Sequence, residues 1–258
     1  MKKRQPGVRN GGVEMADEQS DVAFSQGRPA ILLIAGFGDT SEMYSNLLKT
    51  PLANSFRLLP TDLPGFGAPA LETTNLQTLA CHVAEVARLE EARIIVAHSV
   101  ASIVASLAAA QPDCPLRQIL SLEGNLTAED AYFSGTAADH DDPLAFRTAF
   151  LARLDDMAED DPVIARYRQK VASADARALW DLGCDARRFS NEEVPGDVLM
   201  ASADVTYFYN PENCPQASLD RIAASRMRRV VLADASHWPS VDQPELLARE
   251  IQVSLENG

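Results

Sequence analysis

The stretch Ile94-Ile95-Val96-Ala97-His98-Ser99-Val100-Ala101 decides how the rest of the sequence is interpreted. An apolar run of strand length meets a helical pattern at Ser99, and such a serine must sit on a sharp, strained turn that lifts its hydroxyl above the sheet. Alanine stands two residues before and two residues after Ser99, where a strand and a helix crowd together and only small residues fit. Taken alone, the pattern also fits an ordinary helix N-cap serine, so the context must decide.

Outward from this stretch, apolar runs of strand length alternate with segments of helical period. We expect strands at residues 30–35, 56–60, 93–97, 118–122, 205–209 and 229–232. We expect helices at residues 41–48, 76–89, 100–110, 215–225 and 241–255. Strands separated by helices predict an α/β protein whose mostly parallel sheet is covered by helices on both faces.

The alternation stops between residues 124 and 195, where the sequence is acidic and predicts several short helices without a strand. We interpret this segment as a helical cap inserted between the core segments 29–123 and 196–258, and the polar residues 1–28 as a mobile tail. A solvated helical hairpin without a ligand role is the alternative. If the cap covers a site, Tyr132, Phe133 and Trp180 are candidate pocket residues, although aromatic side chains more often form cap core.

Composition excludes several classes of protein. The chain has 258 residues, 46% of them hydrophobic and 23% charged, which is typical of a globular protein. A net charge of -14 disfavours nucleic acid as a partner, and no apolar run is long enough to insert into a membrane. Four scattered cysteines and no secretion signal suggest reduced thiols and a cytoplasmic location. No phosphate-binding loop, metal cluster or nicotinamide fingerprint is present, so we expect no cofactor and a monomer or homodimer acting on a small molecule.

Two further segments complete a candidate catalytic site. Gly36-Phe37-Gly38 follows the first strand, where backbone N–H groups of Phe37 and Val100 could together hold an oxyanion. His237 lies shortly after the last expected strand, at the edge of the sheet where a base could reach Ser99. Trp238 follows it and is a pocket candidate. His98, beside the serine, is expected to be structural or to line the pocket, and the remaining histidines, 82 and 140, are expected to be surface or packing residues.

With these motifs in this order, the chain resembles enzymes of the α/β-hydrolase fold from about residue 29 to its C-terminus. The resemblance rests on residues 34–38, 62–67, 97–101 and 236–239. Alanine at positions 35, 97 and 101 and serine at 236 replace the usual His, Gly, Gly and Gly of the family. Members with dehalogenase or epoxide-hydrolase activity use an aspartate nucleophile, so Ser99 disfavours those activities.

The acid partner of His237 is harder to place. Relatives usually carry an Asp after the strand that follows the cap, which makes Asp204 a candidate, but Asp204 precedes the expected strand 205–209 and so lies at the wrong edge of a parallel sheet. After that strand Asn210 and Asn213 take the places of the usual Gly and Asp, and Glu212 is the only acid. Glu123 directly follows strand 118–122, next to the nucleophile strand, and is our preferred acid.

The sequence therefore predicts a cofactor-independent serine hydrolase with the triad Ser99, His237 and Glu123. Its substrate would be small and largely apolar, with an ester, thioester, lactone or ketone-adjacent carbon–carbon bond as the target. A small-molecule receptor or sensor, and a lyase or cofactor-free oxygenase, remain alternatives on the same fold.

Overall fold

The computed structural model describes residues 27–256. The predicted tail therefore lies, except for residues 27 and 28, outside the described residues.

The fold is built on one six-stranded sheet in which every neighbouring pair is parallel. In spatial order its strands are β2 (Arg57–Thr61), β1 (Ala30–Ile34), β5 (Ile94–His98), β6 (Gln118–Leu122), β7 (Asp204–Tyr209) and β8 (Arg228–Val231). A separate small ladder joins β3 (Leu63–Pro64) to β4 (Gly67–Ala68). The sheet confirms the predicted α/β class, and the parallel register brings the carboxyl ends of β1, β5, β6 and β7 to one edge.

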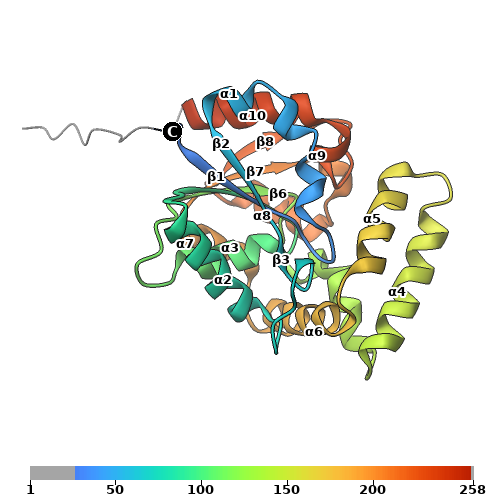
Figure 1. Ribbon diagram of the computed structural model, residues 1–258. Coiled ribbons are helices and arrows are strands. Elements are labelled where there is room, and N and C mark those ends of the chain that lie inside the picture. Colours follow the sequence, from blue (N-terminus) through green and yellow to red (C-terminus); the bar gives the residue numbers. More distant parts are fainter. Residues whose placement is uncertain (1–26, 257–258) are drawn as a thin grey trace, which may run out of the picture.

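Helices cover both faces of this sheet (Figure 1). On one face lie α1 (Leu52–Ser55) and α10 (Pro244–Glu256), and on the other lie α2 (Leu76–Leu89), α3 (Ala101–Ala109) and α7 (Pro195–Ser202). The remaining helices outside residues 124–192 are α8 (Gln216–Ala224), α9 (Pro239–Asp242) and the 3-10 turns η1 (Ser41–Tyr44), η2 (Leu47–Lys49) and η5 (Pro211–Asn213). Covering both faces explains why β1 reads as a continuous apolar run, since all its residues are buried.

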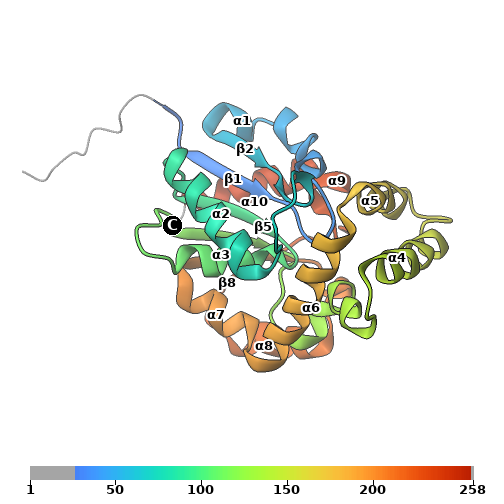
Figure 2. The same cartoon turned by 60° about the horizontal axis from the view of Figure 1, so that its bottom comes forward.

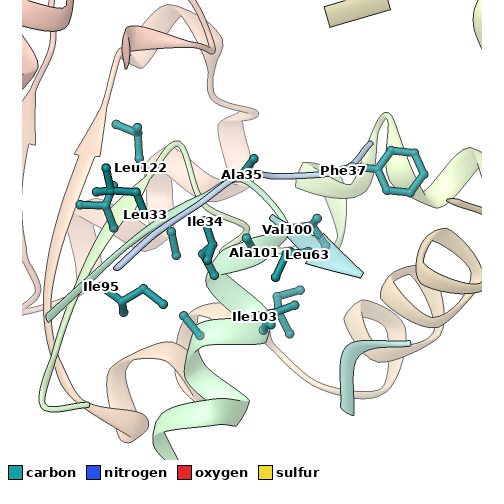
Figure 3. Packing of buried hydrophobic residues seen from close by; sticks show 14 of the residues in the cluster. Leu33, Ile34, Ala35, Phe37, Leu63, Ile95, Val100, Ala101, Ile103 and Leu122 are labelled. Atoms are coloured by element: carbon teal, nitrogen blue, oxygen red, sulfur yellow. The ribbon is translucent and has the colours of Figure 1, made fainter. Parts of the chain in front are cut away.

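The core is continuous between the sheet and α3. Figure 3 shows Ile34 on β1, Ile95 on β5 and Ile103 on α3 packed together, while the ring of Phe37 points away from this cluster. Phe37 instead contacts Phe146 and Phe150, with ring centroids 6.1 and 5.8 Å away. The loop after β1 therefore bridges the sheet core and the helices that follow β6.

Residues between β6 and β7 form a helical layer at the carboxyl edge of the sheet, seen beside the sheet in Figures 1 and 2. Its elements are η3 (Ala128–Ala131), η4 (Ser134–Asp139), α4 (Pro143–Met157), α5 (Pro162–Ser173) and α6 (Ala176–Glu192). Aspartates 142, 161 and 175 cap the three α-helices by accepting backbone N–H bonds, and α4 and α5 continue with proline at the first helical position. Local capping chemistry thus sets where each helix starts.

Two expected helices differ in the structure. The segment 41–48 forms the separate 3-10 turns η1 and η2, because Tyr44 turns into the core and donates a 2.8 Å hydrogen bond to the carbonyl of Ile34. The closing helix expected at 241–255 is divided into α9 and α10 at Gln243, whose backbone is non-helical before Pro244.

Candidate active site

Ser99 stands directly after β5 in a strained conformation with φ of 54°. Its N–H still donates to the carbonyl of Leu122 at 2.9 Å, so the sheet ladder continues up to the residue that turns. Within residues 27–256 no hydrogen bond engages the Ser99 hydroxyl. Gly36 is required beside this turn, because a Cβ there would lie 2.9 Å from the Cβ of Ser99. The turn therefore presents a free hydroxyl at the carboxyl edge of the sheet.

The loop after β1 supplies backbone donors next to Ser99. In the described part of the chain, the N–H groups of Phe37 and Val100 donate to no other protein group, which leaves both available to a ligand. The carbonyl of Phe37 accepts a 2.7 Å hydrogen bond from the hydroxyl of Tyr167 on α5. That bond fixes the orientation of the peptide that follows Phe37.

A partly buried ion pair joins the same loop to α5. The guanidinium of Arg166 donates two hydrogen bonds, of 2.8 and 2.9 Å, to the carboxylate of Asp39. The Asp39 side chain is only 1% exposed, whereas that of Arg166 is 20% exposed. Bidentate pairing with a nearly buried carboxylate ties the helical layer to the loop that carries Phe37.

His237 lies in the loop between β8 and α9, and two side chains face the Nδ1 atom of its imidazole. Its Nδ1 is 3.5 Å from Oε2 of Glu123 and 3.4 Å from the hydroxyl of Tyr132. His98 fixes the backbone, because its Nε2 donates a 2.8 Å hydrogen bond to the carbonyl of His237. With Nδ1 facing the carboxylate, Nε2 is the nitrogen left for a substrate or for Ser99. No hydrogen bond joins His237 to the Ser99 hydroxyl among the described residues.

Glu123 repeats the backbone geometry of Ser99 on the neighbouring strand. It follows β6 directly with φ of 50°, and its N–H donates to the carbonyl of Phe208 at 2.9 Å. Its side chain is 2% exposed. Oε1 accepts hydrogen bonds from the backbone N–H of Asn210 at 2.7 Å and from the side-chain amide of Asn213 at 3.2 Å, which leaves Oε2 facing His237.

The two other acids lie elsewhere. Asp204 is the first residue of β7, at the amino edge of the sheet, and forms an exposed ion pair with Arg228. Glu212 is exposed in η5. Of the three candidate acids, only Glu123 is brought to the imidazole of His237.

A small cavity of about 20 Å³ lies between these groups. Its walls include Phe37, Ser99, Tyr132, Phe133, Tyr167 and His237. About 10–15 Å³ suffices for one water molecule, so this arrangement holds no more than one or two waters. A larger substrate therefore requires groups that line this cavity to move.

The predicted pocket residues divide into two groups. His98, Tyr132, Phe133 and Trp238 all line the cavity. Trp180 is not among the lining residues: its indole N–H donates to the carbonyl of His140 at 2.9 Å, and its ring lies beneath Arg177 on α6. Trp180 therefore packs within the helical layer, as most aromatic side chains of a cap were expected to do.

Burial shapes the electrostatics of the site. Burial, together with the nearby His237, holds the pKa of His98 well below its usual range, so this imidazole is neutral at physiological pH. A neutral His98 ring can make the observed hydrogen bond, because the tautomer protonated at Nε2 donates that N–H to the carbonyl of His237. Burial, with Glu123 and Asp130 nearby, raises the pKa of Tyr132, which therefore stays protonated beside His237. The uncharged neighbours leave Glu123 as the charge that His237 faces.

Within residues 27–256, no three His, Cys, Asp or Glu side chains gather in a way that could hold a metal ion. No helix of that described part is long and apolar enough to cross a bilayer.

The family model described as "Alpha/beta hydrolase family" matches residues 31–250. The chain belongs to this alpha/beta hydrolase family. No curated protein sequence matches it.

Solved structures support the fold of this family member. An esterase from Thermogutta terrifontis aligns with a TM-score of 0.69 at 19% identity, covering 90% of this chain and 91% of the esterase. A hydrolase from Oleispira antarctica aligns with a TM-score of 0.70 at 15% identity, covering 90% and 93%. A 1H-3-hydroxy-4-oxoquinoline 2,4-dioxygenase aligns with a TM-score of 0.70 at 17% identity, covering 88% and 92%. Similar structures thus include enzymes of different reaction types.

Sequence reasoning missed several residues of the site. Asp39 and Arg166 were not singled out, and neither were the contacts of Asn210 and Asn213 with Glu123. Asp39 directly follows the Gly36-Phe37-Gly38 turn, which is a signal that could have drawn attention to it. Its arginine partner lies 127 residues away, and no local pattern indicates such a pair.

Proposed function

We propose that this protein is a serine hydrolase in which Ser99 is the nucleophile, His237 the general base and Glu123 the acid that orients His237. The observation that carries the proposal is the approach of Glu123 Oε2 to His237 Nδ1, 3.5 Å apart, beside a cavity that both His237 and Ser99 line. Nδ1 of His237 has two neighbours, the hydroxyl of Tyr132 and the carboxylate of Glu123. Tyr132 keeps its proton and is neutral, so Glu123 is the charged partner of Nδ1. The acid therefore favours the tautomer whose Nε2 is a free base.

In the proposed reaction, Nε2 of His237 removes the proton of the Ser99 hydroxyl as its oxygen attacks the acyl carbon. The carbonyl oxygen becomes an oxyanion, which the free N–H groups of Phe37 and Val100 stabilise. His237 then returns the proton to the leaving group, and water repeats the two steps on the acyl-enzyme to release the acid.

The proposed substrate class is a small, largely apolar acyl compound. The cavity is small, and its walls are mainly aromatic. The cavity has two acids. Asp39 is paired with Arg166, and Asp130 accepts hydrogen bonds from the backbone N–H groups of Leu126 and Thr127 and from the hydroxyl of Ser218, so both offer little charge to a ligand. An ester, a thioester, a lactone and a ketone-adjacent carbon–carbon bond all present a carbonyl oxygen to the same two N–H donors. The proposal therefore names the class of reaction and not one of these four bonds.

Labelling with a fluorophosphonate tests the proposal without knowledge of the substrate. The serine oxygen displaces fluoride from phosphorus only if it is activated as a nucleophile, so we expect one phosphonyl group on Ser99, located by mass spectrometry of peptides, and none in Ser99→Ala. Glu123→Gln should slow labelling by about a hundredfold or more, whereas Asp204→Asn should leave the rate unchanged. An unreactive Ser99 would favour a binding protein, and loss of labelling in Asp204→Asn would transfer the acid role to that residue.

A further inference from the structure

The end of β7 carries two asparagines whose polar groups converge on the proposed acid. Asn210 follows β7 directly and Asn213 ends η5 three residues later. The backbone N–H of Asn210 and the side-chain amide of Asn213 both donate to Oε1 of Glu123, at 2.7 and 3.2 Å. Position 213 thus presents an amide donor to a carboxylate that belongs to the neighbouring strand.

The same two side chains also hold the loop that carries the proposed base. The amide of Asn210 donates to the carbonyl of Ala235 at 2.8 Å, and that of Asn213 donates to the same carbonyl at 3.2 Å. Ala235 precedes His237 by two residues. One amide group of Asn213 therefore contacts both the acid and the histidine loop, and it sets the distance between them.

Only a donor suits position 213. Oε1 of Glu123 and the carbonyl of Ala235 are both acceptors, and both lie 3.2 Å from the same nitrogen. A carboxylate in its place would put oxygen against two oxygens and a second negative charge beside a side chain that is 2% exposed. Hydrogen bonds to the ionised form are what keep a buried carboxylate charged.

We propose that Asn213 is a positioning residue that holds Glu123 by its Oε1 and so directs its Oε2 toward His237. Asn213 itself touches no reacting atom. The inference rests on the proposed function, because it assigns Glu123 as the acid of the triad. It goes further because it gives the residues that follow β7 a role, which is to position an acid that follows β6.

The other titratable groups around Glu123 allow a pH test. His237, Tyr132, Tyr207 and Cys214 face the carboxylate, and Asp130 lies near the last three of them. Burial, with Glu123 and Asp130 as further causes, raises the pKa of Cys214 to about 12 and also raises that of both tyrosines. Burial raises the pKa of Asp130, but its carboxylate is held by its own bonds to Ser218, Leu126 and Thr127.

A double-mutant cycle tests whether Asn213 acts through Glu123. The rate of fluorophosphonate labelling at Ser99 is measured for the unsubstituted protein, Asn213→Ala, Glu123→Gln and the double variant. Asn213→Ala should slow labelling by about tenfold to a hundredfold when Glu123 is present. It should slow labelling by less than about threefold in Glu123→Gln, because the carboxylate that it positions is gone. Equal factors in both backgrounds would mean a merely structural effect and would overturn the inference.

A second variant, Asn213→Asp, provides a readout that lost packing alone does not move. The added carboxylate puts a second negative charge beside Glu123 and His237, and a nearby negative charge disfavours the loss of a proton. In a plot of labelling rate against pH, the acidic limb should therefore move to higher pH by about one unit or more. Asn191→Asp adds the same charge at an exposed position on α6 and should leave the limb in place.

The outcomes separate this inference from the proposed function. An unshifted limb in Asn213→Asp would overturn the role of Asn213, while labelling of Ser99 and its loss in Glu123→Gln would leave the triad intact. If the unsubstituted protein does not label, or if Glu123→Gln labels at the full rate, the triad assignment is overturned and the inference with it.

Discussion

At the scale of single residues, the site depends on backbone conformations that most side chains avoid. Ser99 and Glu123 end neighbouring parallel strands, β5 and β6, and both have φ near 50°. Each such residue costs on the order of 1–3 kcal/mol and persists only where its surroundings hold it. Their amides still join the sheet ladder, so the turn redirects the side chain without breaking the strand. Two strained residues side by side are what bring a hydroxyl and a carboxylate above the same sheet edge.

The packing of Gly36 against this turn gives a prediction for a single methyl group. In Gly36→Ala the new Cβ would lie 2.9 Å from the Cβ of Ser99 and 3.0 Å from the carbonyl oxygen of His98. Relief of that overlap requires the loop with Phe37 to move, so labelling at Ser99 should slow at least tenfold and unfolding free energy should fall by about 1–3 kcal/mol. Urea unfolding and labelling rates measure both. Gly27→Ala, whose Cβ meets no atom within 4 Å, should change neither.

Three residues of the proposed site could be predicted from local pattern. Ser99 and His237 lie at strand ends, and the placement of Glu123 followed from the direction of a parallel strand, so the structure brings Glu123 and His237 together as expected. The contact of Asn213 with Glu123 and the Asp39–Arg166 pair could not be predicted, because they join segments 90 and 127 residues apart. Their partners depend on side-chain packing between elements, which no spacing in one segment encodes.

At the scale of secondary structure, capping and proline explain most of the agreement and the differences. Helix α2 has the predicted bounds, and it starts at a reciprocal cap between Asn75 and Thr78. The expected closing helix was divided because Pro244 restrains the residue before it. The segment 41–48 has helical spacing but became two 3-10 turns once Tyr44 entered the core. The helix predicted from local propensity therefore formed where a cap reinforced it. The predicted helix did not form as expected where a proline or the packing of Tyr44 in the core opposed it.

Helix α5 connects the helical layer to the loop after β1, and Arg166 is one of the residues that anchor it there. In Arg166→Met the Asp39 carboxylate, 1% exposed, loses its bidentate partner. An uncompensated buried charge costs about 3–5 kcal/mol, which should appear as lost stability in urea unfolding, together with slower labelling because the loop of Phe37 loosens. Adding Asp39→Asn should recover much of the stability.

A matched control lies on the same helix. Arg168→Met breaks a pair with Asp155 in which the two side chains are 33% and 56% exposed, and such surface pairs contribute roughly 0–1 kcal/mol. Equal losses of stability in the two arginine variants would contradict the anchoring role of Arg166.

At the scale of the whole molecule, the parallel sheet gathers groups from distant segments at one edge. Strands β1, β5, β6 and β7 all run toward the site, so the loops that follow them carry Phe37, Ser99, Glu123 and Asn210. The alternation of strands and helices in the sequence was sufficient to predict this convergence. The division into core and cap stays a prediction, and the small closed cavity was not predictable from spacing, since it depends on how α5 and the residues around Tyr132 pack over the edge.

His98 links this architecture to the pH dependence of folding. It is 2% exposed, and burial holds its pKa well below the usual value, so it takes up a proton near pH 6.5 only in the unfolded chain. The unfolded state therefore gains protons first as the pH falls, and the free energy of unfolding should drop by about 1.4 kcal/mol per pH unit below about 6.5. Above that pH the imidazole is neutral in both states and contributes no slope.

Replacing this histidine should remove that slope. In His98→Gln an amide can still donate to the carbonyl of His237, but no group at position 98 titrates. Urea unfolding at pH 7.5 and 5.5 should therefore show a loss on acidification that is about 1.4 kcal/mol smaller than in the unsubstituted protein. The other ionisable groups are the same in both proteins, so their contributions largely cancel. His82→Gln is a graded comparison: partial burial in α2 lowers the pKa of His82 too, but the side chain keeps access to water, so its effect should be smaller. Equal pH slopes in His98→Gln and the unsubstituted protein would show that His98 binds protons alike in the folded and unfolded states, and would contradict the lowering of its pKa by burial.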